Sequence, residues 1–180
     1  RLGRLTQKLL TLTKLDSSVE EEREILDAAP VVRKVVRMLL PLARLRGIGI
    51  DTTFEPDCSV MTVEDDLYQI VFNLTENAIK YNRQDGWVGV SVRRAGDQVE
   101  LRVEDSGAGI PPESMEHIFE RFYRVDKARS RAAGGAGLGL SIVHDMVERS
   151  YGTITVQARP GGGTIFTVRF PHFDLEEDET

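Results

Sequence analysis

The 180-residue sequence has a single cysteine, Cys58, and no long apolar run. One cysteine cannot form an internal disulfide, and no cysteine–histidine cluster has the spacing of a zinc site. We therefore expect a domain that works in a reducing, cytoplasmic compartment. No stretch approaches the roughly 20 continuous apolar residues that cross a bilayer, and we see no signal peptide.

The chain also lacks an excess of basic residues, since its formal net charge is -6. Non-specific binding to nucleic acid depends on basic patches that release counterions from phosphates, so we expect no direct nucleic-acid partner. Apolar residues make up 41% of the chain and recur along its whole length. The length and this content favour one compact α/β or α+β domain with at most a short appendage.

The first residues read as the end of a longer helix. Leu2, Leu5, Leu9 and Leu12 alternate in steps of three and four, as in a coiled coil or helical bundle. The turn-forming run at 16–18 then breaks the pattern and predicts a hinge. Because the chain begins without methionine in mid-pattern, we expect a piece excised from a longer polypeptide.

From residue 19 onward, periodicity and turn residues predict helices alternating with strands. The helices are expected at 28–46, 64–82, 112–122 and 138–150. The strands are expected at 22–26, 48–54, 58–63, 87–94, 98–105, 153–159 and 163–170. The stretch at 123–137 is basic, rich in glycine and without periodicity, which is typical of a functional lid, and 174–180 reads as an acidic, solvated tail.

The helix predicted at 64–82 contains the sequence NLTENAIKYN. At 100° per residue, Asn73, Asn77 and Lys80 lie within an arc of roughly 60° on one face, beside the apolar face. An asparagine carbonyl is a hard oxygen ligand that suits Mg²⁺, and a lysine beside it can neutralise phosphate. An ordinary polar edge facing solvent explains this segment alone equally well.

The sequence VEDSGAGIP follows a predicted strand. It presents Asp105 at the end of a sheet, where Gly107 and Gly109 allow the backbone to turn tightly. A carboxylate there can accept a hydrogen bond from an exocyclic amine such as that of adenine. A plain loop after a strand uses the same residue types, so this motif is weak by itself.

The sequence GGAGLGLS at 134–141 leads directly into a helix. Glycines before a helix N-terminus expose backbone N–H groups and a positive dipole end to phosphate. A P-loop would require lysine where Leu140 stands, and a dinucleotide-binding fingerprint would require a preceding strand. A flexible linker that starts a helix remains the alternative.

Two sets of side chains lie before these glycines. Three aromatic residues are spaced to anchor the base of the loop: Phe119, Phe122 and Tyr123. Three basic residues could reach a terminal phosphate: Lys127, Arg129 and Arg131. A solvated basic loop would account for the same charges.

Together and in this order, the motifs resemble the histidine-kinase branch of the ATPase superfamily that includes gyrase B, Hsp90 and MutL. NLTENAIKYN resembles the N box, VEDSGAGIP the first G box, IFERFYRVDKARSR the F box with the ATP lid, and GGAGLGLSIV the second G box. The resemblance implies an α+β fold, a two-layer α/β sandwich (Bergerat fold) with a mixed sheet of about five strands on about three helices. It also implies three parts: the end of the second dimerisation helix and a hinge at 1–18, the catalytic ATP-binding domain at 19–173, and the tail at 174–180.

The resemblance assigns a role to each matching position. Asn77 would ligate Mg²⁺, Asn73 and Lys80 would support the phosphates during transfer, and Tyr81 would lie against the base. Asp105 would read the adenine amine, and Thr164 would help to hold the adenine end. The other nucleotide-binding positions implied are Gly107, Gly109, Ile110, Lys127, Arg129, Gly135, Gly137, Leu138 and Gly139. Ala136 departs from the threonine often seen in the second G box, where backbone groups do the binding.

The implied activity is that of a protein-histidine kinase that uses ATP and Mg²⁺. Its implied partners are a phosphoacceptor dimerisation domain of the same protein and a response regulator that receives the phosphate on an aspartate. The parent would be a homodimer, anchored in the cell membrane. His144-Asp145 imitates the acceptor pair but directly follows the glycine-rich loop, and His117 and His172 lack even that context. We therefore expect that the chain alone does not phosphorylate itself.

The residue at position 73 distinguishes phosphoryl transfer to a protein from hydrolysis of ATP by water. The hydrolysing relatives carry glutamate there as a general base for water, whereas an amide cannot accept a proton at neutral pH. Asn73 thus disfavours a chaperone-like or repair-type ATPase. A degenerate sensor that binds ATP without transferring phosphate stays open, although the complete set of motifs argues against it.

Overall fold

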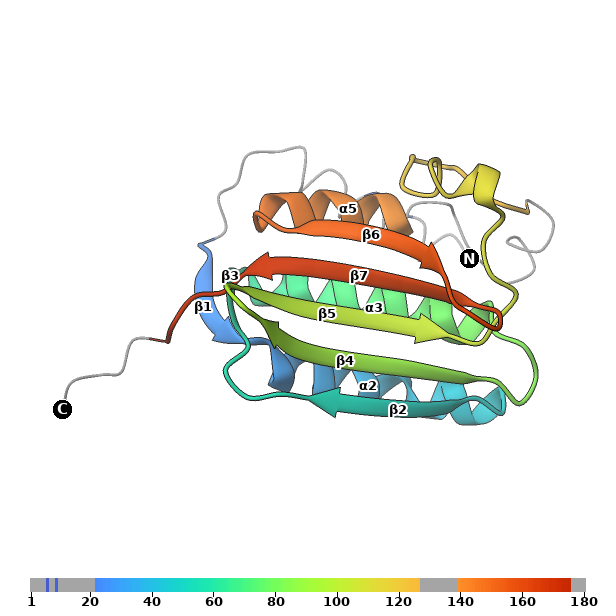
Figure 1. The fold of residues 1–180 in the computed structure, drawn as a ribbon, viewed down its shortest axis with the longest axis horizontal. Coiled ribbons are helices and arrows are strands. Elements are labelled where there is room, and N and C mark those ends of the chain that lie inside the picture. The colour runs from blue at the N-terminus through green and yellow to red at the C-terminus, as the bar shows by residue number, and fades with distance from the viewer. Residues whose placement is uncertain (1–5, 7–8, 10–21, 127–138, 176–180) are drawn as a thin grey trace.

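The protein forms two layers, a sheet and a layer of helices that covers one of its faces (Figure 1). The computed structural model describes residues 6, 9, 22–126 and 139–175. The helices are α2 (Ala28–Leu45), α3 (Glu64–Lys80) and α5 (Gly139–Arg149). The five-stranded sheet has the order β2-β4-β5-β7-β6, with β2 (Gly49–Phe54), β4 (Trp87–Ala95), β5 (Gln98–Asp105), β7 (Thr164–Pro171) and β6 (Thr153–Ala158). This confirms the predicted α+β sandwich.

The sheet is mixed because β2 pairs with β4 in parallel, while the remaining pairs are antiparallel. The other two strands, β1 (Glu24–Asp27) and β3 (Ser59–Thr62), form a separate antiparallel pair. The strands predicted at 48–54 and 58–63 thus belong to two different sheets. The strands predicted at 87–94 and 98–105 are confirmed as β4 and β5, and the register Ala95↔Gln98 shows that they form a hairpin.

The alternation of side chains along β5 explains how the sheet meets the helices. Val99, Leu101 and Val103 are buried, and the residues between them are polar and only partly buried. Successive strand residues point to opposite faces, so this pattern aims every second residue at the helical layer. Asp105 continues the buried series by one more step. The last residue of the strand therefore places a carboxylate on the core side of the sheet.

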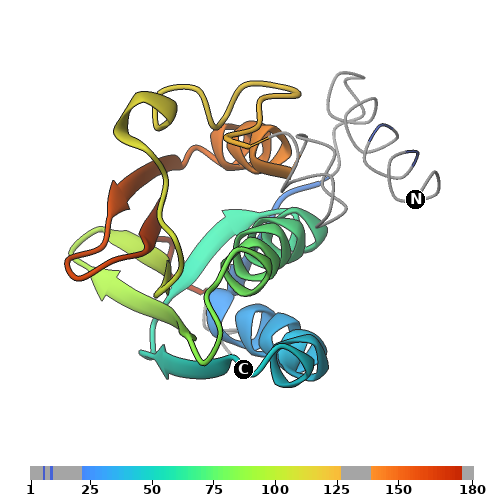
Figure 2. The same cartoon turned by 90° about the vertical axis from the view of Figure 1, so that its right-hand side faces the viewer.

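The helix α3 lies between α2 and α5 in the covering layer (Figure 2). At its N-terminal end, Asp66 accepts hydrogen bonds from Nε and Nη2 of Arg149 at 2.6 to 2.9 Å, in a bidentate pair with the last turn of α5. The hydroxyl groups of Thr62 and Ser150 are also hydrogen-bonded, at 2.7 Å. These contacts fix the N-terminal end of α3 to the C-terminal end of α5. The first residue of α5, Gly139, lies at the opposite end of that helix.

The helix predicted at 112–122 is wrong. Only one 3₁₀ turn, η1 (Pro112–Ser114), forms there, and four of the backbone amides at 115–123 bond to the carbonyl three residues earlier. The tyrosine hydroxyl of Tyr123 donates to Ser114 Oγ at 2.9 Å, which closes the segment on itself. Successive tight turns give apolar residues the same spacing as a helix does, so periodicity could not distinguish the two.

The aromatic residues of this segment divide into two groups. Phe119 and Tyr123 pack against the core, as expected for the base of a loop. Phe122 does not, because its backbone adopts a φ of 64° and its side chain is 62% exposed. The prediction that Phe122 anchors the loop is therefore wrong.

Several predictions fall on positions outside the described residues. They concern the hinge at 16–18, most of the leucine seam and most of the lid, and the domain boundaries stay predictions. Residues 6 and 9 are helical, in agreement with the helix expected there. Among the described residues, no helix has the length and apolar character needed to span a membrane.

Candidate functional site

Three segments that are distant in the sequence meet where β5 ends. They are the C-terminal end of α3, the turn after β5, and the turn that leads into β7. The register pairs Asp105 with Thr164, the first residue of β7, and both side chains are buried. The structure thus brings Tyr81 of the predicted N box together with Asp105 and Gly107 of the first G box and with the predicted threonine.

Asp105 is the most perturbed acid at this junction. Its Oδ1 accepts a hydrogen bond from the Gly107 backbone N–H at 2.8 Å, and only 9% of the residue is exposed. Burial raises the pKa of Asp105 to about 6, and the backbone amides of Gly107 and Thr164 lower it only in part. The ionised carboxylate is therefore short of stabilising partners, so a hydrogen-bond donor from a ligand would be favoured there.

Close backbone contacts hold the three segments together. A Cβ atom on Gly107 would lie 2.6 Å from the carbonyl oxygen of Tyr81, at the end of α3. A Cβ atom on Gly163 would lie 1.8 Å from the carbonyl oxygen of Asp105, and Gly163 has a φ of 111°. Glycine is thus required at both positions by space, and at Gly163 also by conformation. The tight turn predicted from the glycine pattern is a three-way backbone junction.

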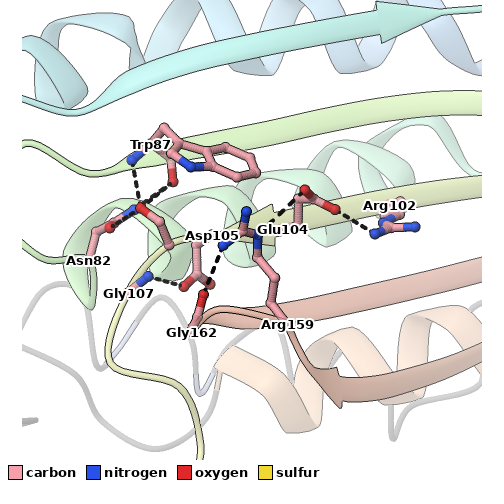
Figure 3. A network of polar contacts seen from close by, with 9 residues as sticks. Asn82, Trp87, Arg102, Glu104, Asp105, Gly107, Arg159 and Gly162 are labelled. Carbon is pink, nitrogen blue, oxygen red and sulfur yellow. Dashed lines mark hydrogen bonds and ion pairs between the residues drawn. The ribbon is translucent and has the colours of Figure 1, made fainter.

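A small hydrogen-bond network beside the junction was not predicted from the sequence (Figure 3). Asn82 donates from Nδ2 to the carbonyl oxygens of Ala78 and Trp87, at 3.1 and 2.9 Å. Its Oδ1 accepts from the Ser106 hydroxyl at 3.2 Å, and Ser106 Oγ in turn accepts from the Trp87 N–H at 2.8 Å. Asn82 thereby joins the end of α3 to the start of β4 and the turn after β5. An asparagine just after a helix is the only local signal that could have suggested this role.

On the opposite face of the sheet, a second network supports the turn before β7 (Figure 3). The Arg159 guanidinium lies 4.6 Å from the centre of the Trp87 ring and donates to the Gly162 carbonyl at 3.1 Å. It also lies 3.8 Å from Glu104, whose other oxygen pairs with Arg102 at 2.6 Å. This network lies outside the junction, and we assign it the role of holding the β6–β7 turn against β4 and β5.

The predicted polar stripe occurs on α3. Asn73 is 8% exposed, and Asn77 and Lys80 are partly buried. An ordinary polar edge would face solvent, so the burial of Asn73 argues against that alternative. Lys80 forms an ion pair with Glu76 one turn earlier, and both side chains are mostly buried. Glu76 was not predicted as part of the site, although the spacing of four residues is typical of such pairs.

The remaining predicted residues are placed as follows. Ile110 is partly buried against the core, Gly109 has a φ of 77°, and Tyr81 is partly buried beside Gly107. Gly139 is the first residue of α5. The other predicted positions of the lid and second G box lie outside the described residues: Lys127, Arg129, Arg131, Gly135, Gly137 and Leu138.

Two of the three histidines, His117 and His144, occupy surface positions, whereas the side chain of His172 is only 7% exposed. His144 lies on α5, its side chain 39% exposed and its ring centre 5.6 Å from that of Phe119. Its nitrogens lie 3.9 Å from Asp145 and 3.8 Å from Glu148. The exposed ring of His117 is hydrogen-bonded through Nδ1 to the Glu120 carboxylate at 2.7 Å. Neither histidine lies in the junction around Asp105.

Comparison with known proteins gives consistent matches. The family described as "Histidine kinase-, DNA gyrase B-, and HSP90-like ATPase" matches residues 62–174. The sensor-like histidine kinase SenX3 of Mycobacterium tuberculosis is 37% identical over 172 residues, which cover 95% of this chain and 42% of SenX3. The chain thus spans less than half the length of this curated relative.

Two solved structures share the fold at similar levels of identity. The mycobacterial sensor histidine kinase MprB superposes with a TM-score of 0.72 and 29% identity, over 85% of this chain and 99% of that one. Full-length ShkA in complex with AMPPNP superposes with a TM-score of 0.84 and 28% identity, over 98% of this chain and 37% of ShkA.

Proposed function

Because this chain belongs to the histidine kinase-, DNA gyrase B- and HSP90-like ATPase family, as an ATP-binding domain of the sensor histidine kinase type, we propose that it binds Mg-ATP at the Asp105 junction. It then donates the γ-phosphoryl group to a histidine on a dimerisation domain of the same protein. The response regulator that receives this phosphate on an aspartate is the second partner. The names of the relatives as sensor kinases support a role in signal transduction, and we propose in addition that the parent is a homodimer anchored in the cell membrane.

The observation that carries the proposal is the buried carboxyl group of Asp105 opposite Thr164. Its two backbone donors leave the charge under-stabilised, and burial keeps the pKa near 6. The exocyclic amine of adenine supplies a further donor, and the hydroxyl of Thr164 lies on the adjacent strand to hold the same end of the base. The solved complex of ShkA with AMPPNP supports a nucleotide site in this fold.

The phosphate end of the site is proposed on α3. Asn73, Asn77 and Lys80 lie on one face, and the amide oxygens are ligands of the kind that Mg²⁺ prefers. The donor set fits a Mg²⁺ ion shared with nucleotide phosphates, with Asn77 as the protein ligand. The ion supplies charge neutralisation for phosphoryl transfer. Lys80 and the N-terminal end of α5 at Gly139 provide positive charge beside it.

Transfer is favoured over hydrolysis by the side chain at position 73. The Asn73 amide cannot accept a proton from water, so it orients a phosphate or the metal but does not activate a nucleophile. The phosphoryl group is held until an external acceptor reaches it. The chain's own histidines on the described surface lie outside the junction, which is consistent with an acceptor on another domain.

The site assignment is tested by calorimetric titration with Mg-ATP. The chain is expected to bind in the micromolar range, and binding is expected to be lost in Asn77→Ala and in Asp105→Ala. Asp97→Ala provides a matched control, because Asp97 is an exposed aspartate in the turn at the opposite end of β5. If Asn77→Ala and Asp105→Ala both bind with undiminished affinity, the assigned residues are wrong.

A further inference from the structure

The helix α2 has an unusual composition for a helix at the surface. Its 18 residues, AAPVVRKVVRMLLPLARL, are alanine, valine, leucine, methionine, proline, arginine or lysine, with no acidic and no neutral polar side chain. One face is buried in the core through residues such as Val32, Val35 and Leu39. The opposite face of a helix in a soluble domain normally carries charges of both signs and hydrogen-bonding groups. Here that face has only apolar and cationic groups.

This exposed side, which we term the α2 face, consists of Lys34, Arg37, Met38, Pro41, Arg44 and Leu45. At 100° per residue these positions fall within an arc of roughly 120°. All six are exposed, Met38 to 57% and Leu45 to 84%. Two large apolar side chains are therefore exposed between cations, and the sulfur of one of them, Met38, accepts a hydrogen bond from the Tyr68 hydroxyl at 2.7 Å.

The α2 face is open because of its place in the fold. In the helical layer α3 is central and α2 is at one edge, so that no described helix covers the far side of α2 (Figure 2). The two helices run in the same direction, since Lys34 lies 5.8 Å from the ring centre of Tyr68 and Arg46 donates to the Lys80 carbonyl at 3.2 Å. The C-terminal end of the α2 face thus lies nearest the proposed phosphate end of the nucleotide site.

The cations toward the C-terminal end of the α2 face are not paired with any described residue, although one exposed carboxylate lies near this end: Asp85 Oδ1 is 3.7 Å from the position of a Cβ atom on Gly47. Within the described part of the chain, the side chains of Arg37 and Arg44 form no hydrogen bond or ion pair. The exposed acids of the neighbouring helix, Glu64 and Asp65, lie in its first turn, beside the start of α2 and away from Arg44. The whole chain has a net charge of -6, so this cationic face has the opposite sign to the molecule.

We propose that the α2 face binds an anionic lipid surface. A bilayer interface presents acyl chains beside negatively charged headgroups, and an interfacial helix binds it through apolar side chains flanked by lysine and arginine. Both attractions act without directional hydrogen bonds, which matches a face without neutral polar groups. A protein interface carries about one hydrogen bond per 100–200 Å², whereas the side chains of the α2 face offer donors from Lys34, Arg37 and Arg44 but no strong acceptor.

Binding in this way would orient the domain. The helical layer would rest on the lipid through its α2 edge, and the outer face of the sheet, on the other side of the molecule, would stay in water (Figures 1 and 2). The nucleotide site would lie beside the lipid surface and not against it. Arg46, which connects α2 to the C-terminal end of α3, lies outside the α2 face. The inference is independent of the proposed phosphoryl transfer.

The test is co-sedimentation of the chain with vesicles. One set contains phosphatidylcholine mixed with phosphatidylglycerol, and the other contains phosphatidylcholine alone. The chain is expected to bind the mixed vesicles at low salt and not the neutral ones. Arg37→Glu is expected to lower the partition roughly thirtyfold, since it removes one attraction and adds one repulsion. Met38→Ser with Leu45→Ser is expected to lower it several-fold through lost apolar insertion.

The matched control is Arg93→Glu, which changes the net charge equally at an exposed position of β4. Thermal unfolding and Mg-ATP titration verify that each variant is folded and that its nucleotide site is intact. The proposal is overturned if the folded chain does not bind mixed vesicles, in which case an acidic protein surface becomes the better partner. It is also overturned if Arg93→Glu weakens binding as much as Arg37→Glu, or if both changes in the α2 face leave binding unaltered.

Discussion

Asp105 should reduce the stability of the ligand-free domain at neutral pH. Burial raises its pKa from 3.8 to about 6, so the folded state holds this proton more tightly than the unfolded state does. The contribution of Asp105 to the free energy of unfolding is therefore most favourable below about pH 4, falls as the pH rises toward about 6, and is then constant. At 1.36 kcal/mol for each unit of pKa, the loss from this residue is roughly 3 kcal/mol.

The informative substitution is Asp105→Asn, which keeps the shape and removes the charge. The amide oxygen can still accept from the Gly107 N–H, but the amide nitrogen faces the Thr164 N–H, which is also a donor. We therefore expect a net gain of about 1–2 kcal/mol at pH 7.5 rather than the full amount. Near pH 4 the wild-type residue is neutral as well, and the gain should vanish or change sign. Adenine recognition should weaken at least roughly tenfold, because the remaining acceptor oxygen is already used.

Urea unfolding at a series of pH values measures this difference directly. Subtracting the wild-type curve from the Asp105→Asn curve removes the titration of groups that the two proteins share. Asp97→Asn is the control, an exposed aspartate that should leave the difference flat. The reasoning is refuted if Asp105→Asn destabilises the domain by the same amount at pH 4.5 and pH 7.5, since the carboxylate would then be a net stabilising group.

Three further outcomes are expected. Glu76→Gln should tighten Mg-ATP binding about three- to tenfold in calorimetry, because Lys80 would no longer be held by a competing carboxylate; weaker binding would show instead that Glu76 positions the lysine. Gly163→Ala should unfold the domain or lower its melting temperature sharply, since the new Cβ would collide with the backbone of Asp105, whereas Gly161→Ala, at a similar φ in open space, should cost only about 1 kcal/mol. Equal shifts would refute the packing argument. Radiolabelled ATP should leave no phosphate on the 180-residue chain but should label an added dimerisation domain of the parent; no labelling in the mixture would favour a nucleotide sensor.

Features set by local periodicity could be predicted from the sequence. The stripe of Asn73, Asn77 and Lys80 follows from helical geometry alone, and Asp105 follows from the alternation of β5. Each depends on residues within one element, so the sequence contains the necessary information. The segment at 112–122 shows the limit, because tight turns and a helix give apolar residues the same spacing.

Features that depend on contacts between elements could not be predicted. The network of Asn82, Ser106 and Trp87 joins positions up to 24 residues apart, and nothing in the local sequence around any of them indicates the partner. The bidentate pair of Asp66 and Arg149 is separated by 83 residues. These groups become neighbours only after the sheet has formed, so a sequence pattern shows their chemistry and not their position.

The two ends of the proposed nucleotide site differ in how far they are prepared for a ligand. At the adenine end, the backbone contacts of Gly107 and Gly163 fix Asp105, and its charge lacks a donor that adenine provides. At the phosphate end, Lys80 already has an anionic partner in Glu76, so binding phosphate requires one ion pair to be exchanged for another. Such an exchange yields little net free energy compared with pairing a free cation. Adenine should therefore provide most of the discrimination between nucleotides, and the terminal phosphate should add little affinity until Glu76 is neutralised.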